Sequence, residues 1–250
     1  MNKILCIIQA RMSSVRLPWK VMMEVNWIPL LKYELDRVKK SKKIDKIVIA
    51  TSNWEEDAKI ANFCIENNID CFRWDLNNVL KRYYDCSVKY HDYYKIVRIT
   101  WDCPLIDEKI IDKTIELFEQ SDVDYCSNCE FPTFPDWLDL EVFTKKSLEI
   151  AYNNAWLNSE KEHVTPYIRK HFKKISYCLK QEDYSDYRLT VDEQKDFELV
   201  KILINNIWSN NDFRDYINYI KKNNVSINAH ITRNEWFAKS INEDKSLLNK

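Results

Sequence analysis

The sequence contains no glycine in 250 residues, although an average usage of about 7% would give roughly 17. Glycine is the residue that adopts positive φ freely and lets the backbone approach a ligand closely. Other residues must therefore occupy the tight turns of this chain. Tryptophan is the candidate, because its nine copies all fall at predicted turns or element ends. They are Trp19, Trp27, Trp54, Trp74, Trp101, Trp137, Trp156, Trp208 and Trp236.

Long apolar runs and an excess of either charge are also missing. No run approaches the ~18 residues of a membrane span, and the N-terminal ILCIIQA is too short for a signal peptide. The net charge is −1, so any anion site must be a local cluster. Eight scattered cysteines suit reduced thiols, and Cys126-x-x-Cys129 lacks the second pair of a zinc site. We expect a cytoplasmic protein without membrane or nucleic-acid partners.

Short β-branched runs alternate with amphipathic segments in the first half of the chain. The runs predict strands at 3–10, 46–51, 69–73 and 94–100, and the apolar spacing predicts helices at 28–41, 55–67, 76–91 and 107–121. Strands that alternate with helices imply an α/β fold with a mainly parallel sheet. In such sheets, ligands bind beyond the carboxyl ends of the strands.

The pattern changes after residue 122. Further strands are predicted at 123–128, 138–144, 174–180 and 187–191, and helices at 145–155, 160–172 and 193–223. The last ten residues are polar, and we expect them to be frayed. No repeat or composition break divides the chain, so we predict a single domain with a core of about 1–205 and a C-terminal helical extension of about 206–250.

Three cations follow the first predicted strand. Arg11 and Arg16 offer bidentate forks for phosphate oxygens, and Lys20 offers a point charge. Three cations alone would more often form a solvated basic loop. Their position directly after the first strand favours a polyphosphate site.

Two aspartates end other predicted strands. Asp102 follows the strand in RITWDCPLID (98–107), and Asp192 follows YRLTV. Mg²⁺ is usually bound by one or two carboxylates together with phosphate oxygens, so the pair predicts a shared metal site. Either carboxylate alone could be a helix cap, a role that we assign instead to Asp107. His163, on a predicted helix, is a weaker candidate for a substrate contact, since a lone helical histidine is more often structural.

These motifs resemble those of the cytidylyltransferases that activate acidic sugars. The motifs occur in family order over residues 3 to 205, and are most similar to the branch of spore-coat polysaccharide protein F, near the 3-deoxy-manno-octulosonate and acylneuraminate cytidylyltransferases. They read QARMSSVRLP-K, IPLL, ATS, RITWDCPLID, FPDWLDLEVF, EHVTPYI and LTVDE.

The resemblance implies a three-layer nucleotide-binding fold like that of the A-type glycosyltransferases, with a mainly parallel mixed sheet. It implies transfer of CMP from CTP to a hydroxyl of an acidic sugar, with release of pyrophosphate, in cell-surface polysaccharide biosynthesis. It also leaves room for a homodimer.

The resemblance further implies roles for individual residues. Asp102 and Asp192 would bind Mg²⁺ and, with Arg11 and Lys20, form the catalytic set. Arg188 would clamp the sugar carboxylate, or would instead pair with Asp183 or Asp186 at the surface. The predicted nucleotide contacts are Ala10, Arg11, Arg16, Lys20, Ser52, Asn53, Thr100 and Asp102. The predicted sugar contacts are Asp139, Glu141, His163 and Arg188.

The chain departs from this family at its tryptophans. The family has glycine at the positions of Trp19, Trp101 and Trp137, and positive φ costs any other residue about 1 kcal/mol or more. We predict that these are glycine sites, with tight-turn backbone and indoles that point outward or crowd the nucleotide cleft. Our hypothesis is that UGA codons have been translated under the wrong genetic code, or else that glycine has been deliberately replaced. UGG codons in the gene would contradict the first explanation.

Two other functions compete with this interpretation. A glycosyltransferase of the same fold would use a nucleotide-sugar donor, with Asp122-x-Asp124 as a D-x-D-like metal motif. A catalytically inactive homologue would have its phosphate loop blocked by Trp19.

Overall fold

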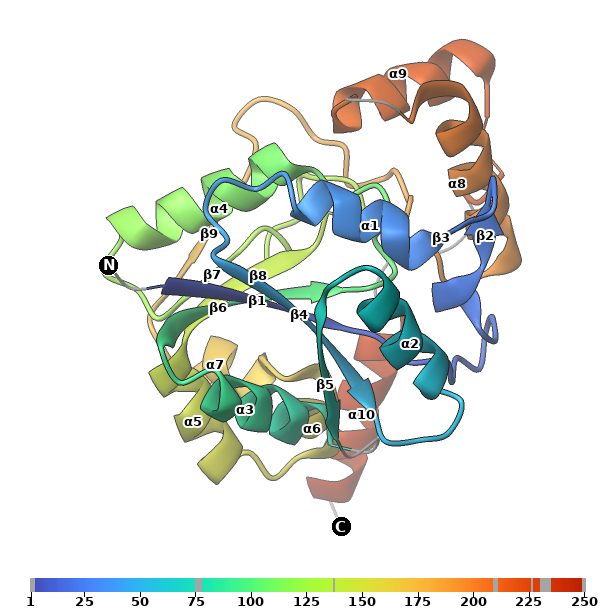
Figure 1. The fold of residues 1–250 in the computed structure, drawn as a ribbon. Coiled ribbons are helices and arrows are strands. Elements are labelled where there is room, and N and C mark those ends of the chain that lie inside the picture. Colours follow the sequence, from blue (N-terminus) through green and yellow to red (C-terminus); the bar gives the residue numbers. More distant parts are fainter. Residues whose placement is uncertain are drawn as a thin grey trace.

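The computed structural model describes residues 3–74, 78–136, 138–208, 211–225, 227–229 and 235–248, with the side chains of 235, 236, 247 and 248 left out. Seven strands form one twisted sheet in the order β5-β4-β1-β6-β8-β7-β9 (Figure 1). The strands β5, β4, β1 and β6 are parallel, and β8 is antiparallel to both β6 and β7. This is the mainly parallel mixed sheet that the sequence predicts. Its strands are β1 (Lys3–Gln9), β4 (Lys46–Ser52), β5 (Asp70–Trp74), β6 (Tyr93–Thr100), β7 (Tyr125–Ser127), β8 (Leu140–Thr144) and β9 (Lys174–Ser176).

Helices cover both faces of the sheet and make a three-layer fold (Figure 1). One face packs against α1 (Leu30–Val38), α2 (Ala58–Glu66), α4 (Glu108–Gln120), α8 (Gln194–Ile207) and α9 (Phe213–Asn223). The other packs against α3 (Val79–Lys89), α5 (Lys145–Asn154) and α7 (Pro166–His171). The central strand β1 is buried on both sides, which explains its unbroken apolar run.

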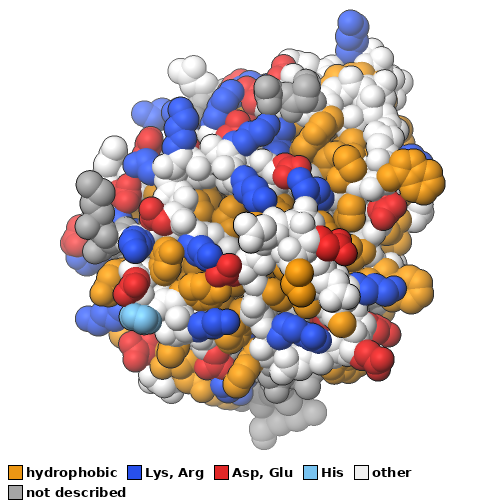
Figure 2. Space-filling model, viewed as in Figure 1, with side chains coloured by type: hydrophobic (Ala, Val, Ile, Leu, Met, Phe, Trp, Pro, Cys, Tyr) orange, Lys and Arg blue, Asp and Glu red, His pale blue; other side chains and the backbone are white. Residues whose placement is uncertain are grey.

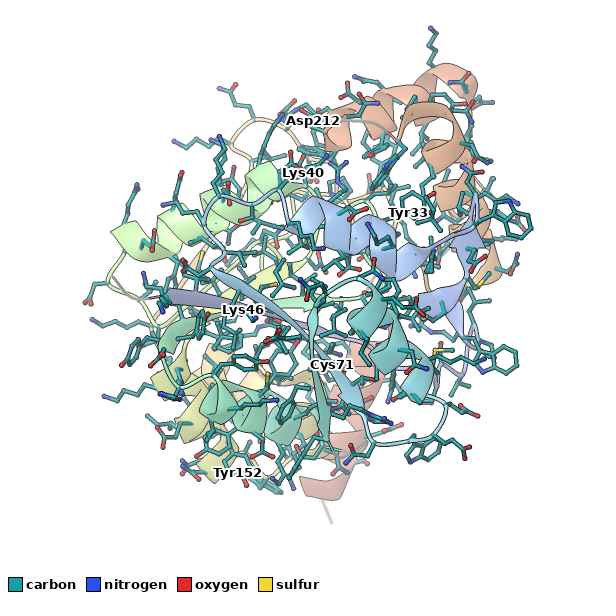
Figure 3. All side chains as sticks on the ribbon, in the orientation of Figure 1. Tyr33, Lys40, Lys46, Cys71, Tyr152 and Asp212 are labelled. Atoms are coloured by element: carbon teal, nitrogen blue, oxygen red, sulfur yellow. The ribbon has the colours of Figure 1, made fainter. Side chains whose placement is uncertain are left out.

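Several local features differ from the sequence-based expectation. A 3₁₀ turn, η1 (Lys20–Met22), and a small hairpin of β2 (Glu24–Val25) and β3 (Ile28–Pro29) precede α1. Tyr33 of α1 lies between this hairpin and α8 (Figure 3), where its hydroxyl donates to the carbonyl of Val25 at 2.9 Å. The hairpin therefore delays the start of α1 by two residues.

The segment 187–191 is not a strand, contrary to the prediction. It makes only an isolated bridge between Arg188 and Asp136. Asp136 donates its N–H to Tyr187 at 2.8 Å and accepts from the N–H of Leu189 at 3.0 Å. These bonds place the segment against the loop of Asp136 instead of along a sheet edge.

The predicted fraying of the last ten residues is also wrong for the described part. Helix α10 (Glu235–Leu248) runs almost to the C-terminus and packs against α6 (Asn158–His163). A buried aspartate, Asp244, bonds the backbone at the start of α6. The polar tail therefore forms a helix that is docked on α6, and one of its polar side chains makes the contact.

The strand order changes direction beside β1. The chain runs from β1 outward to β4 and β5, then crosses back to β6 on the other side of β1. Gln9 and Thr100, the last residues of β1 and β6, are paired. Ligands of open α/β sheets bind at this kind of switch point, so the fold itself places the loops after β1 and β6 at the candidate site.

Basic and acidic side chains are interspersed over the face shown in Figure 2. Within the described part of the chain, no helix has the length and apolar character needed to cross a bilayer.

Candidate active site

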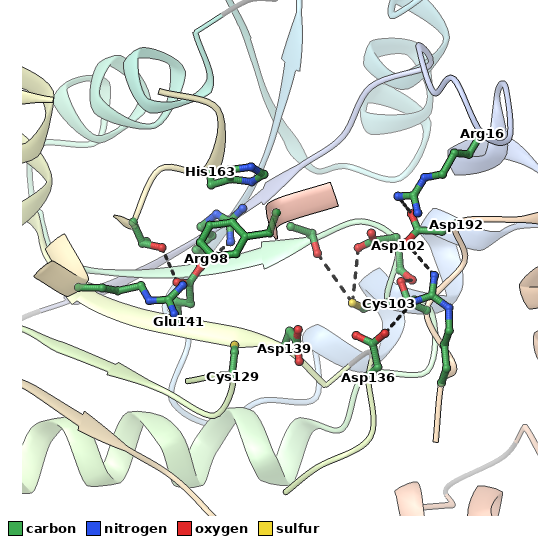
Figure 4. A pocket seen from close by; sticks show the side chains of 16 residues that line it. Arg16, Arg98, Asp102, Cys103, Cys129, Asp136, Asp139, Glu141, His163 and Asp192 are labelled. Carbon is green, nitrogen blue, oxygen red and sulfur yellow. Dashed lines mark hydrogen bonds and ion pairs between the residues drawn. The ribbon is translucent and has the colours of Figure 1, made fainter. Parts of the chain in front are cut away.

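Two cavities open at the carboxyl ends of β1 and β6. The first, of about 310 Å³, is lined by the loop after β1 and by residues after β6. The second, of about 260 Å³, extends toward β8, α6 and α7 (Figure 4). Six side chains line both cavities: Arg16, Arg98, Thr100, Asp102, His163 and Asp192. The two cavities are therefore neighbouring parts of one site.

The loop after β1 is fixed by backbone hydrogen bonds. Met12 donates its N–H to Asp57 at 2.7 Å, and Trp19 donates its N–H to the carbonyl of Met12 at 3.2 Å. Ala10, Arg11 and Arg16 line the first cavity, as predicted for a nucleotide site. The closed loop thus presents its cations to the cleft.

Trp19 adopts a left-handed backbone conformation, with φ 58° and ψ 10°. Its indole is 58% exposed and lies beside Lys59, whose Nζ is 5.4 Å from the ring centroid. Trp19 lines neither cavity. The inactive-homologue interpretation requires an indole that blocks the phosphate loop. The Trp19 indole does not do so.

Lys20 is buried at the floor of the first cavity. Its Nζ donates to Oδ1 of Asp192 and to the carbonyl of Val191, both at 2.8 Å. It also lies 4.5 Å from the ring centroid of Trp101. The ammonium therefore has a fixed position within the cleft.

Trp101 differs from Trp19. It lies in a turn and is only 7% exposed, and its backbone is outside the left-handed region. Its side chain lines the first cavity. Trp101 is therefore a buried core residue at the wall of the cleft, contrary to the prediction of a glycine site with positive φ, while Trp137 lies outside the described residues.

Asp102 and Asp192 are 90 residues apart in the sequence, but hydrogen bonds hold their two segments side by side. The backbone N–H of Val191 donates to the carbonyl of Asp102 at 3.0 Å, and the hydroxyl of Thr190 donates to the same carbonyl at 3.2 Å. The two predicted metal ligands therefore reach one cleft (Figure 4).

Asp192 is surrounded by cations. Its Oδ1 pairs with Arg16 at 2.7 Å and with Lys20 at 2.8 Å, and its Oδ2 pairs with Arg188 at 2.9 Å. Burial alone would raise the pKa of Asp192, but Lys20, Arg16 and Arg188 lower it. The carboxylate is therefore ionised at neutral pH and balances the phosphate-loop cations.

Asp102 is the carboxylate of this pair that is open to a magnesium ion, since both oxygens of Asp192 pair with cations. No cluster of three acidic, histidine or cysteine side chains suited to a metal occurs among the described residues. Mg²⁺ needs only one or two carboxylates when phosphate oxygens and water complete its shell. Asp102 accepts only a weak contact from Cys103 Sγ at 3.6 Å, so its oxygens are available for such an ion.

Arg188 is not available as a carboxylate clamp. Its guanidinium pairs with Asp136 at 2.7 Å, with Asp192 at 2.9 Å and with Asp196 at 3.1 Å. Burial would lower its pKa, but Asp196, Asp136 and Asp192 raise it. The two predicted roles, the clamp and the surface pair with Asp183 or Asp186, are therefore wrong. Arg188 is instead buried and orients Asp192.

Arg169 of α7 is the clamp candidate that the sequence reasoning missed. It lines the second cavity, where burial would lower its pKa but the nearby Tyr125 and Glu141 raise it. Its only ring contact is with Phe237, at 5.6 Å. It directly follows the EHVTPYI motif (162–168), so helical spacing from Thr165 was the available signal.

Glu141 lines the second cavity, but both of its carboxylate oxygens already bond to neighbouring side chains. It accepts from Tyr125 at 2.6 Å and Thr165 at 2.5 Å and pairs with Arg98. Burial would raise the pKa of Glu141, while Arg98 and Arg169 lower it. It therefore orders the cavity wall, which Asp139 also lines.

His163 lies where the two cavities meet and is followed by a strained turn. Val164 has φ 71° and ψ −53°, and the N–H of Thr165 donates to the carbonyl of His163 at 2.8 Å. Such a γ-turn is rare and is an outlier for a β-branched residue. Strain of this kind often marks functional sites.

Other predicted residues do not reach the cleft. Ser52 is buried, and its hydroxyl bonds Asp57. Asn53 follows it in an exposed turn, where its N–H donates to Trp74 at 2.9 Å. Neither lines a cavity, whereas the unpredicted Arg82 of α3 lines the first one.

The D-x-D-like motif also lies away from the site. Asp122 is exposed and pairs with Lys173 at 2.9 Å. Asp122 and Asp124 precede β7, which runs in the same direction as β6. They therefore lie at the amino-terminal end of β7, whereas the cavities open at the carboxyl ends of β1 and β6.

Comparisons with known proteins agree with this geometry. A family model described as "Cytidylyltransferase" matches residues 5–231. An uncharacterized protein of Methanocaldococcus jannaschii is 38% identical over 227 residues, 88% of this chain and 91% of that protein. The spore coat polysaccharide biosynthesis protein SpsF of Bacillus subtilis is 34% identical over 216 residues, 81% of this chain and 87% of that protein. A solved cytidylyltransferase of Leptospira borgpetersenii superposes with a TM-score of 0.86 at 35% identity, covering 93% of this chain and 99% of that one.

Proposed function

The chain belongs to the cytidylyltransferase family, and we propose that it transfers CMP from CTP to a hydroxyl of an acidic sugar and releases pyrophosphate. The similarity to a spore coat polysaccharide biosynthesis protein supports a role for this activity in cell-surface polysaccharide synthesis. The observation that carries the proposal is the wall shared by the two cavities, which contains Asp102 and Asp192. Two substrates bound side by side would meet at these carboxylates.

The first cavity suits the triphosphate. Arg11, Arg16 and Lys20 face it from one loop, with Lys20 nearest the α-phosphate and the arginines toward the β- and γ-phosphates. Asp192 is the anion that Arg16 and Lys20 bind in the structure. Phosphate oxygens then become additional partners of cations whose positions Asp192 has already set.

Asp102 and Asp192 are the residues that would bind Mg²⁺. When bound, the ion would neutralise charge on the phosphate oxygens and so favour departure of pyrophosphate. Arg188 orients Asp192 for this task through its bond at 2.9 Å. Preorganised charge of this kind is the main source of catalysis in phosphoryl transfer.

The second cavity suits an acidic acceptor. Arg169 lines this cavity, and guanidinium forks bind carboxylates bidentately. With the carboxylate there, a hydroxyl of the sugar can point toward Asp102 and the α-phosphate. The hydroxyl oxygen bonds to the α-phosphorus, the bond to the bridging oxygen breaks with its electrons leaving in pyrophosphate, and the hydroxyl proton passes to solvent.

Pyrophosphate release from CTP tests the proposal. We expect release with acidic sugars such as 3-deoxy-manno-octulosonate, and far less with their neutral counterparts. Arg169→Gln should raise the KM for the acidic sugar about tenfold or more, as expected for loss of a charged hydrogen-bond pair, and leave the KM for CTP unchanged. A nucleoside diphosphate product from a nucleotide-sugar would instead support the glycosyltransferase.

A further inference from the structure

We propose that helix α10 is a wall of the acceptor site, and that Phe237 and Ser240 are positioning residues that orient His163 and Arg169 toward the acceptor. This inference rests on the proposed cytidylyl transfer. It gives the C-terminal extension, which the sequence presents as a polar appendage, a part in substrate binding.

Asp244 anchors α10 to the site. Its carboxylate accepts the backbone N–H groups of Asn158 at 3.2 Å and Ser159 at 3.0 Å. These are the first residues of α6, whose N-cap, Leu157, has no side-chain acceptor of its own. An aspartate from α10 thus caps the helix that ends at His163, so α6 and α10 are joined as one unit.

Ser240 determines the tautomer of His163. The Ser240 hydroxyl donates its single proton to the carbonyl of Phe237 at 2.9 Å, so its oxygen must accept from His163 Nε2, also at 2.9 Å. The proton of a neutral imidazole is then on Nε2. This leaves Nδ1 as a hydrogen-bond acceptor for a sugar hydroxyl.

Phe237 contacts both polar groups of the pocket. Its ring meets the imidazole of His163 edge-on, with centroids 4.9 Å apart, and lies 5.6 Å from the guanidinium of Arg169. Phe237 also lines the second cavity. The Phe237 ring therefore holds His163, the group proposed to bind a hydroxyl, and Arg169, the group proposed to bind a carboxylate, at a fixed separation.

The surroundings keep His163 neutral. Burial lowers the pKa of His163 to about 4, with Glu162 and Glu141 opposing and Arg98 and Arg169 assisting the shift. These charges come from α6, β8, β6 and α7, while α10 contacts the ring through the uncharged Phe237 and Ser240. At neutral pH the imidazole can accept a hydrogen bond from a hydroxyl, which an imidazolium could not.

The decisive variants are Ser240→Ala, Ser240→Thr and Ser246→Ala. Ser246 is the matched control, since it lies on the same helix, is exposed, and donates to Glu243 at 2.6 Å. Ser240→Ala should raise the KM for 3-deoxy-manno-octulosonate about five- to tenfold, as expected for one lost hydrogen bond, with the KM for CTP unchanged. Ser240→Thr should restore the value, and Ser246→Ala should not alter it.

Nitrogen NMR of the histidine rings gives a readout that needs no turnover, with His163 assigned from the spectrum of His163→Gln. We expect His163 to be protonated on Nε2 alone at pH 7, and this preference to be lost in Ser240→Ala. An unchanged acceptor KM in Ser240→Ala, or protonation of His163 on Nδ1, would overturn the inference. Absence of pyrophosphate from the parent chain would defeat the proposed function, and the NMR result alone would then decide the role of Ser240.

Discussion

At the scale of single residues, tryptophan occupies backbone positions that favour glycine. Trp19 and Trp27 have φ of 58° and 65°, where any residue with a Cβ is strained by about 1 kcal/mol or more. The other positive-φ residues of the described chain are three asparagines and Val164, and asparagine tolerates this region. That tryptophan stands for glycine in this chain remains a prediction, and the gene sequence tests it.

Replacing tryptophan by glycine should strengthen nucleotide binding. Trp19→Gly relieves backbone strain, and Trp101→Gly removes the indole beside Lys20 from the cleft. We expect the double variant to bind CTP more tightly by isothermal titration. Trp27→Gly is the control, because its side chain is 92% exposed and lines neither cavity. Equal CTP affinity in parent and double variant would make Trp19 a functional residue.

Asp192 should be essential for turnover. Asp192→Asn keeps the shape but removes the charge that meets Arg16, Lys20 and Arg188, so we expect pyrophosphate release to fall at least about 100-fold. Asp196→Asn, which also removes a partner of Arg188, should lower the melting temperature but leave turnover of the folded protein intact. Near-normal release by Asp192→Asn would refute the metal role.

Sequence reasoning found the residues whose place follows from the strand ends. Arg11 and Lys20 lie on the loop after β1 and Asp102 follows β6, and parallel strands bring these ends together. Asp192 follows a segment that is not a strand, and it reaches the cleft because Thr190 and Val191 bond the carbonyl of Asp102. Side chains that become partners only through tertiary packing gave no such signal in the sequence. Arg188 was predicted to clamp a substrate carboxylate or to pair at the surface, because its bonds to three buried carboxylates depend on the tertiary fold.

At the scale of elements, periodicity predicted the buried strands and the longer helices. Asp107 caps α4 as predicted, accepting from the N–H of Lys109 at 2.9 Å. The failures are elements whose stability comes from distant contacts. Segment 187–191 is bonded to Asp136 instead of a strand, and α10 depends on a docking surface that no local pattern shows.

The cap that joins α10 to α6 should contribute measurably to stability. Asp244→Ala removes the acceptor for two backbone N–H groups, so we expect the free energy of unfolding in urea to fall by about 1 kcal/mol. Glu243→Ala, on the exposed side of the same helix, should change it by less than about 0.5 kcal/mol. Equal effects of the two substitutions would show that Asp244 is not an anchor.

At the scale of the whole molecule, the buried imidazole links stability to pH. His163 has its pKa lowered to about 4, whereas an unfolded histidine titrates near 6.5. The unfolded chain therefore binds the extra proton first, and stability falls as pH drops from about 6.5 toward 4. His163→Gln should show a shallower fall of melting temperature over this range. Parallel curves for the two proteins would contradict a neutral buried His163.

The fold places a nucleotide cavity and an acceptor cavity against one pair of carboxylates. The central claim is that this arrangement joins CMP to an acidic sugar. The most direct measurement incubates CTP, Mg²⁺ and 3-deoxy-manno-octulosonate with the chain and with its Trp19→Gly, Trp101→Gly variant, and quantifies the products by mass spectrometry. We predict a CMP-sugar and pyrophosphate in equal amounts, formed faster by the variant. CTP recovered intact from both proteins across a panel of acidic sugars would contradict the account.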